Sequence, residues 1–201
     1  MRRLTVTLCE YRELAPSAQA AAREWYRAKV LAKDPTPVAL VTEHATRRLA
    51  ELGYPSEDIQ FRLSYCQGDG LAFYGLAHGD AVVRIARRVL SPRDAAHIER
   101  VRDVALLTLR PNGLAPRYAH ENTMEVRVDL DTRRFEVFHR HRRLASLLDR
   151  LRDAVRTEIK EVSRSLANDG YQILEHCSSD EAVVDAINDL YEFTADGRVW
   201  H

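Results

Sequence analysis

Four polar residues in two separate segments have the side-chain types that ligand binding or acid–base chemistry requires: Gln67, Asp69, His120 and Glu121. A histidine changes its charge near neutral pH, so an imidazole beside two carboxylates can move protons or hold a divalent metal. These four residues are separated by about fifty positions in the chain. They could act together only if the fold brings the two segments to one place.

The first segment predicts a hairpin whose turn carries a lone acid between two glycines. Gly68 and Gly70 flank Asp69, and short aromatic runs of strand type lie on both sides of residues 67–70. Glycine supplies the positive φ that tight hairpin turns need, so Asp-Gly between such runs favours a turn here. The turn would present backbone N–H groups and a carboxylate at a sheet edge, where a polar ligand can bind.

Three interpretations of the four polar residues stay open. Asp69 can stabilise its own turn while His120 and Glu121 lie solvated on a long loop, the set can bind a ligand, or it can do chemistry. The glycines around Asp69 do not form a phosphate loop, because no Gly-Lys-Ser follows them. The cysteines Cys9, Cys66 and Cys177 are widely spaced, which favours reduced thiols over a zinc site. We therefore expect no catalytic residue, metal or cofactor.

A basic run supplies a second candidate binding surface. Arg140, Arg142 and Arg143 lie in a stretch, residues 132–164, that holds ten basic and five acidic residues. The following stretch, residues 165–201, reverses this balance with one basic and eight acidic residues. Neighbouring elements that attract each other, or two solvated faces, explain this pattern most simply. A partner-binding surface is the alternative, either for an acidic protein or for nucleic acid.

Hydrophobic periodicity predicts elements along the whole chain. We expect strands at 3–9, around the turn at 67–70, at 104–110 and at 123–130, with a long tip at 111–122 between the last two. Helices are expected from Pro16, at 38–52, 80–90, 92–102 and 180–190, together with a long helix at 141–167 that Asn168, Asp169 and Gly170 interrupt. An Asp-Gly turn predicts a small closing hairpin at the end of the chain.

These elements predict one α+β domain over residues 1–201. Its antiparallel sheet would consist of two hairpins and the N-terminal strand, covered by several helices that include the long C-terminal one. Residues 141–201 would form a helical C-terminal part with the closing hairpin. The chain has 30 basic and 30 acidic residues, so no global charge indicates nucleic acid, although the basic run leaves that partner open.

Four segments give the chain a resemblance to a family of small phage and prophage proteins. These are residues 11–27 with a Glu-Trp-Tyr-Arg ending, 64–75 with Gln-Gly-Asp-Gly, 118–121, and 179–197 with Tyr-Glu-Phe-Thr. The family is commonly labelled as antitoxins of a toxin–antitoxin stability system. The sequence departs from the family pattern at Cys66, where the pattern has serine, and at Leu71, where it has alanine.

The resemblance implies a mobile-element protein that acts in the cytoplasm of a bacterial host. We expect it to bind and inhibit a host protein or protein complex, either a toxin or an antiviral defence component, without catalysis. The alternative is a nucleotide-binding sponge or weak hydrolase that uses Gln67, Asp69, His120 and Glu121. The sequence leaves open whether the chain forms a homo-oligomer. The N-terminus lacks the apolar run of a signal peptide, and no stretch has the length of a membrane span, so no membrane association is expected.

Overall fold

A computed structural model of the chain describes residues 7–115, 117–131, 142–188 and 190–200. The chain divides into two compact units, residues 1–40 with 172–201, and residues 41–171. Two helices, α2 (Thr36–Leu52) and α5 (Arg142–Ser178), run through the boundary between the units. The boundary differs from the one at residue 141 that the sequence suggests. A single domain over the whole chain stays a prediction.

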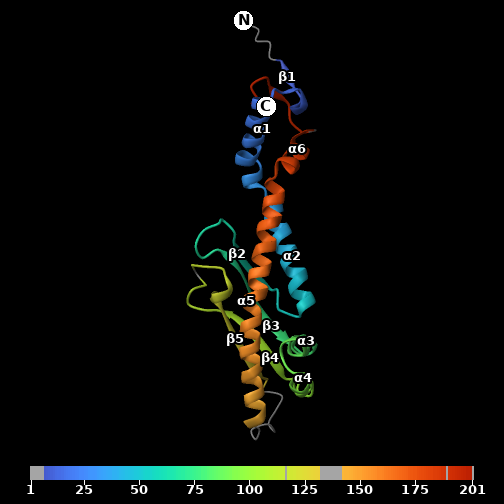
Figure 1. The fold of residues 1–201 in the computed structure, drawn as a ribbon, viewed down its shortest axis with the longest axis vertical. Helices are drawn as coiled ribbons and strands as arrows, with labels where there is room; N and C mark the ends of the chain where they lie inside the picture. Colours follow the sequence, from blue (N-terminus) through green and yellow to red (C-terminus); the bar gives the residue numbers. More distant parts are fainter. Residues whose placement is uncertain (1–6, 116, 132–141, 189, 201) are drawn as a thin grey trace. The chain divides into compact units, whose positions relative to one another are not determined.

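The larger unit, residues 41–171, contains a four-stranded antiparallel sheet and helices that cover it (Figure 1). The strand order is β2-β3-β4-β5. Besides its parts of α2 and α5, this unit consists of β2 (Asp58–Arg62), β3 (Gly70–His78), α3 (Asp80–Val89), α4 (Pro92–Glu99), β4 (Ala105–Pro111) and β5 (Met124–Leu130). The expected α+β class with an antiparallel sheet, several helices and one long C-terminal helix is confirmed.

The two predicted hairpins form, and their register places two loops near each other. Arg62 pairs with Gly70 across β2 and β3, and Pro111 pairs with Met124 across β4 and β5. The first loop, residues 63–69, is therefore longer than the predicted turn at 67–70, which was wrong in its extent. Hydrogen bonds of the Asp69 side chain stabilise this longer loop.

Helix α5 contributes one apolar stripe to the core of this unit. Leu147, Leu151, Val155 and Ile159 are buried in one cluster with residues of β3, β4, α3 and α4. The i, i+4 spacing places these side chains on one face of the helix. The buried hydroxyl of Ser163 also donates to the Leu71 carbonyl of β3, which fixes the position of α5 along that strand.

The predicted interruption of the long helix at residues 168–170 was wrong, because α5 continues to Ser178. A Cβ atom at Gly170 would lie 2.6 Å from Leu63 Cδ1 and 3.3 Å from Val41 Cγ1. Glycine therefore permits a close approach of α5 to neighbouring side chains. This packing offsets the roughly 1 kcal/mol by which glycine disfavours a helix interior. Asp169 also accepts a 2.9 Å hydrogen bond from His44.

The smaller unit joins both ends of the chain around an aromatic core. It contains α1 (Pro16–Lys29), α6 (Asp180–Asn188) and a two-stranded sheet of β1 (Leu8–Cys9) with β6 (Phe193–Thr194). The N-terminal strand thus pairs with β6 and not with the two hairpins as expected. Trp25 lies 5.2 Å from Tyr191 between ring centroids, and Ser179 caps α6 through a hydrogen bond from Ala182. The predicted closing turn forms at Gly197, whose φ is +82°.

Candidate functional site

The loops of the two hairpins touch each other, as the sequence allowed. A Cβ atom at Gly68 would lie 2.4 Å from the Tyr118 ring, and a Cβ atom at Gly70 would lie 2.8 Å from His120 Cβ. The absence of a side chain at both glycines therefore lets the two loops touch. Both glycines also adopt a positive φ, +89° at Gly68 and +157° at Gly70. Loop 63–69 and the described residues of loop 112–120 are therefore in contact within the larger unit.

Asp69 directs its carboxylate into its own loop. Its Oδ2 atom accepts hydrogen bonds from the backbone N–H groups of Ser64 at 2.5 Å and Cys66 at 2.8 Å. Its own N–H donates to the Cys66 carbonyl at 3.1 Å. The carboxylate thus accepts from residues three and five positions earlier in the chain, and it satisfies backbone donors of its own loop that a regular strand would pair with a neighbouring strand. Asp69 therefore determines the conformation of the chain between Ser64 and Cys66.

The same hydrogen bonds lower the pKa of the Asp69 carboxyl. The Cys66 N–H contributes most, and the Ser64 N–H, the Tyr171 hydroxyl and the charge of Arg62 act in the same direction against desolvation. Burial, followed by the negative charge of Asp69, raises the pKa of Tyr171, so this hydroxyl stays protonated and donates to Asp69 Oδ2 at 3.3 Å. Asp69 is thus a charged acceptor at neutral pH.

His120 and Glu121 are also engaged within the second loop and its neighbours. His120 precedes the 3₁₀ turn η3 (Glu121–Thr123), and its Nδ1 atom accepts from the Asn122 N–H at 3.1 Å. Glu121 accepts from Arg164 Nε at 3.1 Å and lies 3.9 Å from His120 Nδ1. Among the described residues, no hydrogen bond or ion pair joins Asp69 to His120. The fold brings their loops together but directs the polar groups to different partners.

The remaining predicted site residues divide into two groups. Gln67 is exposed at the turn of the first loop. Arg140 lies outside the described residues, while Arg142 and Arg143 begin α5 with side chains that are likewise not described. The role of the basic run therefore stays a prediction. In the described ranges, no group of three or more His, Cys, Asp or Glu residues could hold a metal ion.

Tyr65 and Tyr171 complete the site, and the sequence interpretation missed both. Their rings stack with centroids 4.4 Å apart and an interplanar angle of 28°. Tyr65 has a φ of +58°, and within the described residues it is the one non-glycine residue with positive φ. Its side chain is nevertheless 70% exposed. Continuing the helical period through Leu166, Ala167 and Gly170 would have placed Tyr171 on α5 facing this loop.

The exposed aromatic and aliphatic side chains of these loops form what we call the two-loop surface: Tyr65, Leu114 and Tyr118. Residues forced into positive φ cost about 1–3 kcal/mol and occur where surrounding structure holds them, often at functional sites. Here the Asp69 hydrogen bonds to Ser64 and Cys66 hold the backbone on both sides of Tyr65. The arrangement therefore keeps one large exposed aromatic ring in a fixed position.

Comparisons with known proteins do not decide among functions for this site. No protein-family model matches the chain, and searches of the curated proteins and of the solved structures find no match. Among the described helices, none has the length and apolar character to cross a membrane.

The geometry predicts how Asp69 responds to acid. The folded-state pKa of Asp69 is lowered. The charged carboxylate therefore stabilises the loop at pH values above the ordinary aspartate pKa of about 3.9, and this stabilisation is lost as pH falls through the folded-state pKa. A carboxyl ¹³C NMR titration should give a midpoint below the ordinary value. The Ser64 and Cys66 amide signals should shift with the same midpoint.

Asp69→Asn provides the control for this titration. It retains the size of the side chain but removes the charge, so the acid-dependent shifts of the Ser64 and Cys66 amides should disappear. A midpoint at or above the ordinary value in the unaltered protein, or amide shifts that persist in Asp69→Asn, would show that the carboxylate does not maintain the loop.

Proposed function

We propose that this chain is a phage or prophage accessory protein that binds and inhibits a host protein assembly without catalysis. Its target would be a toxin or an antiviral defence component in the cytoplasm of a bacterial host. The resemblance of four sequence segments to the phage and prophage family supports this class. The observation that carries the binding mechanism is the exposed Tyr65 ring, stacked on Tyr171 in a positive-φ backbone.

The chemistry of the two-loop surface suits protein recognition. Tyrosine is enriched among residues that dominate binding energy at protein interfaces, because its ring supplies contact area and its hydroxyl a hydrogen bond. A ring that is already held in position loses little conformational freedom on binding. Tyr65 meets this condition through its stack on Tyr171, and Tyr118 through its contact with Gly68.

The engaged polar groups favour binding over turnover. His120 Nδ1 accepts the Asn122 N–H, and the Asp69 carboxylate accepts two backbone N–H groups of its own loop. A general base needs a position from which it can reach a substrate proton. The hydrogen bonds of Asp69 and His120 instead maintain the loops that carry Tyr65 and Tyr118.

A phage-plating assay on a panel of defended bacterial hosts tests this proposal. The unaltered protein should restore plating on the host whose defence it blocks. Tyr65→Ser combined with Tyr118→Ser should abolish this restoration, because it removes both exposed rings from the two-loop surface. Circular dichroism and a melting curve check that the double variant remains folded.

His120→Asn is the matched control for catalysis. The asparagine oxygen can accept the Asn122 N–H as Nδ1 does, so the loop is retained while the imidazole is removed. Restoration of plating should persist in this variant. Loss of restoration in His120→Asn, with the tyrosine variant still active, would favour the alternative ligand-binding or hydrolytic function.

The basic run adds a second arm to the same assay. Replacing Arg140, Arg142 and Arg143 together with glutamate removes three positive charges and adds three negative ones. If this run contributes to binding an acidic partner, the triple variant should lose restoration of plating. Unchanged restoration in the triple variant would confine binding to the two-loop surface.

A further inference from the structure

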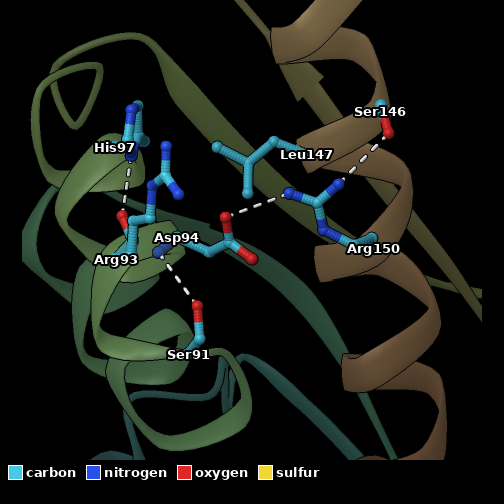
Figure 2. A pocket seen from close by; sticks show the side chains of 7 residues that line it. All are labelled: Ser91, Arg93, Asp94, His97, Ser146, Leu147 and Arg150. Carbon is cyan, nitrogen blue, oxygen red and sulfur yellow. Dashed lines mark hydrogen bonds and ion pairs between the residues drawn. The ribbon is translucent and has the colours of Figure 1, made fainter.

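A concave site lies in the larger unit, and its lining residues include none of the two-loop surface. It is a cavity of about 700 Å³ between helices α4 and α5, within the range of roughly 300–1,000 Å³ that is typical of small-molecule sites. Figure 2 shows Arg93, Asp94 and His97 on one side and Ser146, Leu147 and Arg150 on the other. The buried Leu147 connects the cavity to the core of the unit.

Arg150 is oriented by two contacts and keeps further donors for a ligand. Its guanidinium donates to Asp94 Oδ1 at 3.0 Å and to Ser146 Oγ at 3.2 Å (Figure 2). A guanidinium carries five N–H donors, so these two bonds leave others unused. Among the described residues that line the cavity, Asp94 is the one carboxylate, and Arg150 already neutralises it.

Arg93 differs from Arg150, whose guanidinium is paired with Asp94 and Ser146. Within the described part of the chain, no hydrogen bond or ion pair joins its guanidinium to another residue, and it lies in the first turn of α4. The N-terminus of a helix carries a partial positive charge, so a cation there is unfavourable unless an anion compensates it. Arg93 thus adds a second cation to the cavity without an acidic partner of its own.

His97 and two serines supply further polar groups. His97 Nδ1 donates to the Arg93 carbonyl at 2.7 Å, which leaves Nε2 as the nitrogen available to a ligand (Figure 2). The hydroxyls of Ser91 and Ser146 also line the cavity. Two guanidinium groups and two serine hydroxyls match the donors that recognise phosphate oxygens in proteins, while Nε2 of the neutral imidazole can accept a hydrogen bond from another part of the ligand.

We propose that this cavity binds a small ligand that carries a phosphate group. The phosphate contacts Arg93 and Arg150, and the rest of the ligand lies against His97 and the apolar Leu147. A phosphate would supply the negative charge that Arg93 lacks at the N-terminus of α4. This site is independent of the proposed inhibition of a host protein, because it uses none of the residues of the two-loop surface.

Isothermal titration calorimetry of the unaltered 201-residue chain tests the site with AMP, inorganic phosphate and adenosine as probes. AMP should bind saturably with one site per chain, and adenosine, which lacks the phosphate, should not. Arg93→Gln should weaken AMP binding about tenfold or more, since it removes a charge-assisted contact. If inorganic phosphate also binds, and if Arg93→Gln weakens that binding too, the phosphate group itself provides the affinity of AMP.

Two further variants keep the test specific. Asp94→Asn removes the carboxylate that competes for Arg150, so it should strengthen AMP binding, an effect that general damage to the fold cannot produce. Arg87→Gln removes the same charge from neighbouring α3, where Arg87 pairs with Glu99, and should leave AMP binding unchanged. The proposal is overturned by absent AMP binding at millimolar concentration, equal binding of adenosine, or an unchanged affinity in Arg93→Gln.

Discussion

Leu151→Asp should unfold the larger unit of this protein under conditions in which the unaltered chain is stable. Leu151 is fully buried in the stripe of α5 that packs against the sheet. A carboxylate there has no partner, so the substitution adds the cost of burying a charge to the loss of apolar packing. The sum is about 5 kcal/mol or more, which is comparable to the total stability of a typical domain.

Urea unfolding followed by far-ultraviolet circular dichroism measures this effect. Leu151→Asp should lose the folded baseline, or shift the midpoint to very low urea. Ala145→Asp is the matched control, because it introduces the same charge at an exposed position of the same helix. A normal midpoint for Leu151→Asp would mean that the stripe of α5 does not form the core.

Glu158→Ala should produce the second-largest loss of stability, about 3 kcal/mol. Glu158 accepts hydrogen bonds from the Tyr54 hydroxyl and from Arg88, one of them at 3.1 Å from Arg88 Nη2. Arg88 also lies over the Tyr54 ring, 5.5 Å from its centroid. The carboxylate is only 18% exposed, so its removal leaves the Tyr54 hydroxyl without its acceptor and the Arg88 guanidinium, whose side chain is 30% exposed, without its ionic partner.

The matched control for this variant is Glu161→Ala, which removes an exposed carboxylate from the next turn of α5. It should change the urea midpoint little, whereas Glu158→Gln should fall between the two alanine variants. If both alanine variants unfold at the same urea concentration, the network of Tyr54, Arg88 and Glu158 does not stabilise the unit.

Alkaline pH should weaken the same network. Burial, together with the hydrogen bond to Glu158, raises the pKa of Tyr54 above its ordinary value of about 10. The contribution of the neutral hydroxyl is therefore fully present below pH 10 and is lost as pH rises through the folded-state pKa. Tyr54→Phe should remove this part of the alkaline destabilisation.

Much of the fold could be predicted because local signals and tertiary packing agree. The period of the apolar residues in α5 and the alternation in β5 correspond directly to buried faces. Pro16 begins α1 and Ser179 caps α6, as local chemistry predicts. These features need no knowledge of distant segments.

The misses occur where a distant contact decides the outcome. In the sequence, Gly170 predicts the end of a helix, but close packing against Leu63 and Val41 keeps α5 continuous. The N-terminal strand alternates like a sheet strand, yet its partner β6 lies near the other end of the chain. Alternation indicates that a strand has a buried face but does not identify the strand beside it.

The sequence predicted where the candidate site lies better than it predicted what each of its side chains does. Sequence motifs indicated Asp69 and His120, and their loops do meet through Gly68 and Gly70. The direction of each polar group could not be predicted, because it depends on backbone N–H groups that only the folded loops bring into reach. Hydrophobic periodicity indicates buried faces but neither exposure nor positive φ, so it did not indicate Tyr65.

The most direct test of the account is quantitative capture from the lysate of a host on which the protein restores plating. The unaltered protein and its variants serve as bait, and mass spectrometry compares the captured proteins. The variant with Tyr65→Ser and Tyr118→Ser removes the exposed rings of the two-loop surface. Leu190→Ser is the matched control, since Leu190 is an exposed large apolar residue that is not part of that surface.

We predict one host protein or complex that the unaltered protein, Leu190→Ser and His120→Asn all capture in similar amounts. The double tyrosine variant should lose that protein while it remains folded. Equal capture of the same protein by the double tyrosine variant would contradict binding through the two-loop surface.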